Sequence, residues 1–334
     1  MKTNLLVLFG GESSEHDVSI LSARNVVAAL DHEKYDIRLG YITVNGKWTL
    51  ADSVDQRDES RTLVPQLGKG AFTVSDGTEF TVDVLFPVLH GQHGEDGDVQ
   101  GLANLLHVPC VGPSLLSAAV TMDKDMTKRV LAHAGIPVTP WHTWYSYDPK
   151  PAYKVVTSDL GEDVFIKPNI GGSSVGVSHV TSADQWDTAL DDAAKHADLV
   201  LIEKTVHGRE IELAVLGNAR PEVTSAGEII PGEDFYSFED KYNTGSTAQT
   251  VVPAELPAAM IATLKQHALD AYRVTASRGM SRVDFLLDDT NTLYLNEINS
   301  IPGFTDISMY PKLWQHEGLS YSALLDRLIA LALE

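Results

Sequence analysis

The sequence predicts an α/β protein in which the candidate functional residues lie at or just after the ends of strands. Three observations indicate this class. An apolar run at 4–9 precedes Gly10-Gly11 and then apolar residues at helical spacing. A second apolar run ends at Lys167, ahead of a loop rich in Gly and Ser. The stretch 282–299 alternates apolar and polar residues about a central turn and carries acids on both halves. Strands that alternate with helices favour an α/β fold with ligand sites at strand ends.

Composition narrows the functional classes. A chain of 334 residues predicts more than one compact unit. Asp and Glu number 46 against 25 Lys and Arg, which argues against partners such as nucleic acid or an anionic membrane. The single cysteine, Cys110, excludes a disulfide framework and fits a reducing, cytoplasmic location. Neither a signal peptide nor a membrane span is expected from the apolar runs.

The first part of the chain predicts strand, loop and helix. Apolar residues at helical spacing follow the glycines, and Ser14 and Asp17 have the spacing of a capping box. Because a third glycine is missing, the dinucleotide fingerprint is incomplete and a nicotinamide oxidoreductase is a weak alternative.

A buried strand is predicted at 81–89, and a Gly- and acid-rich loop at 90–101 follows it. His90 and His93 flank this loop without further ligands at zinc spacing, so no zinc site is expected. The four prolines of 135–151 indicate a connector between subdomains.

The central region predicts short strands at 164–167, 175–180 and 199–203. The loop after Lys167 can present backbone N–H groups to phosphate, although the P-loop motif is absent. Glu203 and Glu210 either contact an adenine or ribose or lie at a solvated strand end, and the role of Lys124 is equally open. Helices are predicted at 258–276 and 320–333.

The stretch 282–299 predicts a β-hairpin in which Asp284 lies opposite Glu297 and Arg282 opposite Asn299. Like charges directly opposed across strands are destabilising, so a cation is expected between them. Two carboxylates and an amide oxygen suit Mg²⁺ held together with a phosphate. Leu293 and Leu295 are expected to share the acidic face. The alternative is an exposed hairpin with ordinary surface acids.

Aromatic and charged residues alternate at 234–243, which favours a lid that excludes water, with Lys241 and Tyr242 as its functional candidates. An ordinary surface loop is the alternative.

Seven blocks along nearly the whole chain, in order, resemble the D-alanine–D-alanine ligase family of the ATP-grasp superfamily. They are Gly10–Ser19, Leu89–Gly101, Met122–Lys124, Lys167–Ser178, Ile202–Gly217, Phe235–Tyr242 and Arg282–Pro311. The order and number of these blocks make the resemblance specific, whereas a single block would not.

The resemblance implies a three-subdomain ATP-grasp architecture with an N-terminal Rossmann-like domain. The expected units are 1–112, a central ATP-grasp subdomain at 113–203, and a C-terminal one at 204–334 with the lid and the magnesium site. It also implies ATP, two Mg²⁺ ions (for which Mn²⁺ can substitute) and two D-alanines, joined through a D-alanyl phosphate for peptidoglycan synthesis. A cytoplasmic homodimer is expected.

The resemblance also implies roles for individual residues. The metal ligands are Asp284, Glu297 and Asn299; the phosphate-binding lysines are Lys124, Lys167 and Lys241; the adenine and ribose contacts are Glu203, Lys204, Val206 and Glu210; the first D-alanine contacts are Glu15 and His90; the oxyanion donors are Arg282 and Gly303; the second D-alanine contacts are Ser308 and Met309; and Tyr242 closes the lid with Glu15 and Ser173.

Two alternatives remain. A D-alanine–D-lactate or D-alanine–D-serine ligase shares all these blocks, but related D-lactate ligases tend to carry phenylalanine where this chain has Tyr242. A nucleotide-binding protein without turnover would lack one of the catalytic groups, and Lys167, Arg282 and Glu297 are all present. The chain departs from the commoner family pattern at 169–171, at Ile301 and at 237–238.

Overall fold

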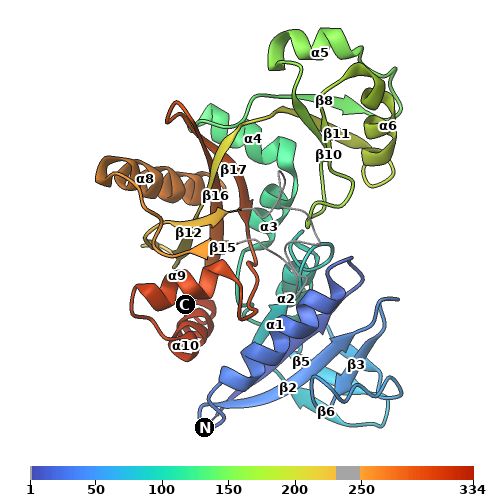
Figure 1. The fold of residues 1–334 in the computed structure, drawn as a ribbon. Coiled ribbons are helices and arrows are strands. Elements are labelled where there is room, and N and C mark those ends of the chain that lie inside the picture. The colour runs from blue at the N-terminus through green and yellow to red at the C-terminus, as the bar shows by residue number, and fades with distance from the viewer. Residues whose placement is uncertain (1, 231–248) are drawn as a thin grey trace.

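The computed structural model describes residues 2–230 and 249–334. The chain forms three main sheets with their helices, and a small three-stranded sheet lies beside the first (Figure 1). The mixed α/β architecture agrees with the predicted fold class. In the part of the chain that the structure describes, no helix has the length and apolar character needed to cross a membrane.

The first sheet has the order β3-β2-β1-β7. Its strands are β1 (Thr3–Gly10), β2 (Tyr35–Ile42), β3 (Trp48–Ala51) and β7 (Val84–Val88), and β1 runs parallel to both β2 and β7. Helices α1 (His16–Ala29) and α2 (Asp98–Leu106) accompany it, and the small sheet contains β4 (Leu63–Gln66), β5 (Ala71–Val74) and β6 (Glu79–Thr81). The strand predicted at 81–89 corresponds to β7, which is shorter, and Thr81 is the last residue of β6.

Both faces of the first sheet are buried, as expected for parallel strands. Leu5, Val7 and Phe9 pack in one core with residues of α1 and of α10 (Tyr321–Ala332). Leu6 and Leu8 pack in a second core with residues of the small sheet and α2. The first sheet thus shares a core with a helix that lies about 300 residues later in the chain.

The second sheet is antiparallel, with the order β10-β9-β11-β8. Its strands are β8 (Trp141–Tyr145), β9 (Val164–Pro168), β10 (Ser178–Val180) and β11 (Leu199–Lys204), and helices α3 (Leu115–Met122), α4 (Lys124–His133), α5 (Tyr153–Leu160) and α6 (Ala183–Ala193) belong to the same part of the chain. The Pro-rich segment 135–151 is therefore more than a connector, because it contributes edge strand β8.

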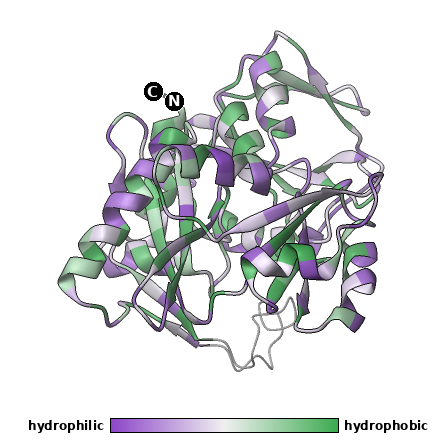
Figure 2. Cartoon of the chain, turned by 90° about the horizontal axis from the view of Figure 1, so that it is seen from above, coloured by the Kyte–Doolittle hydropathy of each residue, from purple (hydrophilic) through white to green (hydrophobic). Residues whose placement is uncertain are grey.

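The third sheet has the order β15-β14-β12-β16-β17, and β13 (Glu222–Val223) also pairs with β12. Its other strands are β12 (Gly208–Leu216), β14 (Gly227–Ile230), β15 (Gln249–Val251), β16 (Met280–Asp288) and β17 (Leu293–Asn299). Helix α8 (Ala258–Val274) packs against one face, and α9 (Met309–His316) precedes α10. In Figure 2 the peripheral helices carry both hydrophilic and hydrophobic residues, which is typical of helices that bury one face.

Two helix starts differ in how well the sequence predicts them. Ser320 caps α10 by accepting a hydrogen bond from the Ala323 N–H, and this helix matches the prediction closely. At α1 the N-cap residue is Glu15 and no side chain caps the helix, so the predicted Ser14 capping box is wrong. Ser13 acts locally instead, because its hydroxyl accepts from the Glu15 N–H and donates to the His90 carbonyl.

Candidate active site

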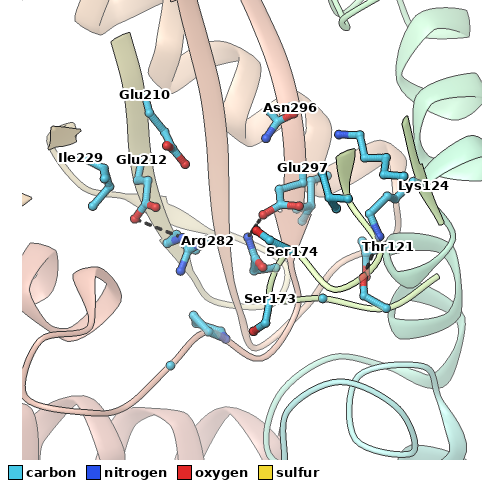
Figure 3. A pocket seen from close by; sticks show the side chains of 18 of the residues that line it. Thr121, Lys124, Ser173, Ser174, Glu210, Glu212, Ile229, Arg282, Asn296 and Glu297 are labelled. Carbon is cyan, nitrogen blue, oxygen red and sulfur yellow. Dashed lines mark hydrogen bonds and ion pairs between the residues drawn. The ribbon is translucent and has the colours of Figure 1, made fainter. Parts of the chain in front are cut away.

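A cavity of about 480 Å³ is lined by residues from the second and third sheets and from loops that follow strands of all three main sheets. In Figure 3, Glu210, Glu212 and Arg282 lie on one side of it and Lys124 on the other, with Glu297 and Ser174 between them. The predicted site residues that line it are Glu15, His90, Lys124, Lys167, Ser173, Glu203, Lys204, Val206, Glu210, Arg282, Glu297, Asn299, Gly303, Ser308 and Met309. Asp284 is 1% exposed and contacts the lining residue Arg282, whereas Lys241 and Tyr242 lie outside the described residues.

The acidic hairpin has the predicted pairing: Asp284 lies opposite Glu297, and Arg282 opposite Asn299. The prediction that Leu293 and Leu295 share the acidic face is wrong, however. An irregularity after Asp284 shifts the register, so that Leu293 pairs with Leu287 in the core against α8. The extra residue in β17 lets one strand bury leucines on one face and still direct its two polar residues, 297 and 299, to the other.

The polar face of this hairpin concentrates charge. Arg282 donates to both carboxylate oxygens of Asp284, at 2.8 Å from Nε and 2.6 Å from Nη2, and its Nε lies 3.1 Å from Glu212 Oε2. Burial would lower the pKa of Arg282, but Asp284 and Glu212 raise it well above its usual value. The guanidinium is therefore held charged in a fixed orientation beside the carboxylates.

The same face fits a divalent cation. The Asn299 amide lies 2.8 Å from Asp284 Oδ2 and 3.5 Å from Glu297 Oε1, measured from Nδ2, so three residues with oxygen ligands converge. A half-turn of the amide would present its oxygen instead. Opposed carboxylates of this kind match the hard, oxygen-rich coordination that Mg²⁺ prefers.

Lysines face the acids across the cavity. Lys124 begins α4, and its Nζ donates to the Gly171 carbonyl at 2.6 Å, which ties the helix to the Gly/Ser loop. Lys167 leaves β9 on the opposite face from buried Val164 and Ile166, and forms an ion pair with Glu203. In the loop, Ser173 and Ser174 have φ values of 51° and 61°, a conformation that non-glycine residues rarely adopt and that functional loops often hold.

The nucleoside contacts predicted after β11 are only partly arranged as expected. Lys204, Val206 and Glu210 line the cavity. The Glu203 carboxylate, in contrast, is bound to Lys128 and Lys167, so that side chain is directed to cations.

The loops after β1 and β7 form another wall. Ser173 donates to Glu15 Oε1 at 2.5 Å, which links the Gly/Ser loop to the N-terminal sheet. His90 is buried, its Nε2 lies 3.0 Å from the Ser22 hydroxyl oxygen, and burial lowers its pKa. A neutral imidazole is therefore expected at neutral pH.

In the loop before α9, Gly303 lies close to Ser308. A Cβ at this position would lie 2.7 Å from the Ser308 hydroxyl oxygen, so the glycine permits a close approach. Ser308 is the N-cap residue of α9, and the Met309 side chain is 3% exposed in the core. An anion bound here would meet the Ser308 hydroxyl and the N–H groups at the start of α9 rather than the thioether.

Sequence reasoning missed three ionisable residues of this region: Lys128 and Glu212, which are buried, and Glu95, which is partly buried. Glu95 and Glu212 line the cavity, and Lys128 reaches Glu203 from α4. Glu212 could have been found from its alternation with Glu210 along one strand. Lys128 carries no such signal, because a lysine four residues beyond Lys124 looks like an ordinary helix surface residue.

The cavity and its residues can now be compared with known proteins. Residues 4–113 match the model of the D-ala D-ala ligase N-terminus, and residues 130–330 match the model of the D-ala D-ala ligase C-terminus. A D-alanine–D-alanine ligase of Sodalis glossinidius is 46% identical over 99% of this chain and 95% of the relative. One from Thermoanaerobacter sp. is 43% identical over 100% of this chain and 97% of the relative.

Solved structures agree. The D-alanine–D-alanine ligase of Coxiella burnetii has a TM-score of 0.89 and 37% identity, and the match covers 99% of this chain and 94% of that one. The VanG D-Ala:D-Ser ligase of Enterococcus faecalis has a TM-score of 0.90 and 32% identity, with 99% and 100% coverage. On these matches, each nearly complete, the chain belongs to the D-alanine–D-alanine ligase family and has its ATP-grasp fold.

Proposed function

We propose that the cavity joins two D-alanines into D-alanyl-D-alanine at the expense of ATP, a reaction that supplies peptidoglycan precursors. The observation that carries this function is that Glu297, which pairs with the buried Asp284, lines one cavity together with Lys124 and Lys167. Such a site suits the phosphates and metal ions of a nucleotide. Family membership supplies the identity of the amino acid.

Asp284, Glu297 and Asn299 would hold two Mg²⁺ ions, or Mn²⁺ in their place. Bound there, the metal neutralises charge on the phosphates during phosphoryl transfer. The chain's own residues do the remaining work. Lys124 and Lys167, together with Lys241, bind the phosphates.

The nucleoside lies beyond the phosphates in this proposal. Lys204 and Val206 contact the adenine, and Glu210 contacts the ribose. Glu203 acts indirectly, because its carboxylate forms an ion pair with Lys167.

The two D-alanines bind at the opposite end of the cavity. Glu15 pairs with the ammonium of the first, next to neutral His90, and the carboxylate of this D-alanine attacks the γ-phosphoryl group to give D-alanyl phosphate and ADP. Ser308 and the N–H groups at the start of α9, including that of Met309, hold the carboxylate of the second. Its amine then attacks the acyl carbon, and phosphate leaves as the peptide bond forms.

Negative charge develops on the carbonyl oxygen during that attack. Arg282 and the Gly303 N–H would donate to it. The charged state of Arg282 and its fixed orientation between Asp284 and Glu212 support this role, because a donor held in place needs no reorganisation during the reaction.

The second substrate is the point at which a different function competes. The structural relative VanG is a D-Ala:D-Ser ligase, so D-serine is a real alternative. Tyr242 favours D-alanine in this proposal, because related D-lactate ligases tend to carry phenylalanine there; its expected partners are Glu15 and Ser173. The direct hydrogen bond between Ser173 and Glu15 supports two members of that set.

We further propose the units 1–112, 113–203 and 204–334, a homodimer, and a cytoplasmic location where ATP is supplied. Limited proteolysis and sedimentation would test the units and the dimer.

Product analysis tests the function. Phosphate release is measured with ATP, Mg²⁺ and D-alanine, alone and with D-lactate or D-serine added, and the products are identified by mass. D-Alanyl-D-alanine as the main product in every tube is expected. A depsipeptide or D-alanyl-D-serine as the main product would overturn the choice of second substrate, and no phosphate release would overturn the activity.

A further inference from the structure

Lys128 is a buried cation outside the roles assigned above. It lies on α4, one turn after Lys124, and is 2% exposed. Its Nζ lies 3.0 Å from Glu203 Oε1 and donates to the Thr139 carbonyl at 3.2 Å. It also lies 5.7 Å from the centroid of the Trp141 ring. Burying a charged lysine costs free energy unless the ammonium group is paired, so the burial of Lys128 calls for a functional explanation.

The Glu203 carboxylate is shared by two lysines. Oε1 faces Lys128, and Oε2 forms the ion pair with Lys167. Burial would raise the pKa of Glu203, but Lys128 and Lys167 together hold it below its usual value. Burial lowers the pKa of Lys128, and the Glu203 carboxylate opposes this shift. In the ion-paired state, with the carboxylate ionised and both lysines protonated, the three side chains carry one net positive charge next to the cavity.

We propose that Lys128 is a positioning residue that keeps the phosphate side of the cavity cationic. It supplies Glu203 with a second partner, so that Lys167 can turn from Glu203 to a nucleotide phosphate without leaving a buried carboxylate unpaired. The inference rests on the proposed binding of ATP phosphates by Lys167.

The charge balance gives the reason. Without Lys128, Glu203 and Lys167 form a neutral pair. Moving Lys167 to a phosphate then breaks a buried ion pair and strands its acid, which is strongly unfavourable. With Lys128 present, the acid stays paired throughout. The effect should therefore depend on the phosphates of the ligand and not on its nucleoside.

Calorimetric titration of the full chain with ATP and Mg²⁺, and separately with adenosine, tests this. In Lys128→Met, ATP should bind about 10-fold more weakly, equivalent to about 1.4 kcal/mol, while adenosine affinity stays the same. The KM for ATP should rise much more than kcat falls. Lys150→Met is the matched control: Lys150 forms an exposed pair with Asp191, and its loss should change neither affinity.

The double variant Lys128→Met/Glu203→Gln separates charge from structure. It removes one positive and one negative charge, restores a single net positive charge on Lys167, and should recover most of the lost ATP affinity. It also remains informative if Lys128→Met alone does not fold. Equal weakening of ATP and adenosine, or a double variant as weak as the single one, would overturn the proposal. A wild-type chain that binds no ATP would instead overturn the proposed function.

Discussion

Replacing Glu95 with glutamine should remove a pH-dependent loss of stability from this protein. The Glu95 carboxyl group accepts hydrogen bonds from two loops, at 2.7 Å from the Gly91 N–H and 3.2 Å from the Ile301 N–H. Burial, and then the negative charge of Glu15, raise its pKa from 4.5 to about 8. The carboxyl group is therefore largely protonated at neutral pH, although it joins the N-terminal and C-terminal walls of the site.

The sign and size of the effect follow from linkage. Between pH 4.5 and about 8 the folded chain keeps the Glu95 proton, whereas the unfolded chain has released it. Stability then falls as the pH rises, by about 1.36 kcal/mol for each pH unit. Over the interval from 4.5 to about 8, which is 3.5 units, the free energy of unfolding falls by about 5 kcal/mol.

Urea denaturation of the wild type and Glu95→Gln at several pH values from 5 to 9 measures this. Since glutamine resembles the protonated acid and cannot ionise, the wild type should lose stability relative to the variant as the pH rises, and the difference should level off above pH 8. Glu15→Gln is the control, because removing that neighbouring charge should lower the pKa of Glu95 and shrink the effect. Parallel stability profiles for wild type and Glu95→Gln would refute the reasoning.

Three further variants test the proposed chemistry. Glu297→Gln should raise the Mg²⁺ concentration needed for half-maximal turnover by at least about 10- to 100-fold, since even residues that only support metal ligands have effects of that size; unchanged turnover across a Mg²⁺ titration would remove Glu297 from the metal site. Arg282→Ala should lower kcat by about 10²- to 10³-fold, the loss typical of an oxyanion donor, with a much smaller change in ATP affinity measured by titration; a pure loss of ATP binding would contradict that role. Tyr242→Phe should raise the ratio of depsipeptide to dipeptide when D-lactate competes with D-alanine, as read by mass spectrometry, and an unchanged ratio would mean that Tyr242 does not set specificity.

The sequence predicts that Asp284 lies opposite Glu297 and Arg282 opposite Asn299, and the structure has these pairs, although Asp284 lies five residues before Asp289 and Glu297 six residues after Asn291. It does not predict the irregularity in β17. Alternation alone places Leu293 with the acids, and only the packing against α8 decides that the leucines turn to the core. The residue pattern around the turn thus indicates which polar residues lie opposite each other, whereas tertiary packing determines on which face of the hairpin the leucines lie.

Some charged residues of the site can likewise be recognised from the local sequence, whereas others depend on contacts that are distant in sequence. Lys167 can be recognised from the sequence because it lies at the end of a predicted strand and is followed by a glycine-rich loop. Lys128 cannot, since its function comes from Glu203, 75 positions away in sequence, which reaches it only once β11 and α4 lie together. The edge strand β8 was missed for a related reason: prolines at both ends of it suggest a linker, and its pairing with β11 is a long-range contact.

The core shared by the first sheet and α10 has a consequence for synthesis on the ribosome. Leu5 and Val7 are translated roughly 320 residues before Leu324 and Leu328, which complete their core. The ion pair between Lys34 and Asp326, at 2.6 Å, spans nearly the same separation. During elongation, one apolar face of the N-terminal sheet therefore remains without the packing of α10 while most of the chain is synthesised. Contacts so distant in sequence form slowly, and the exposed face is where a nascent chain of this protein would most need a chaperone.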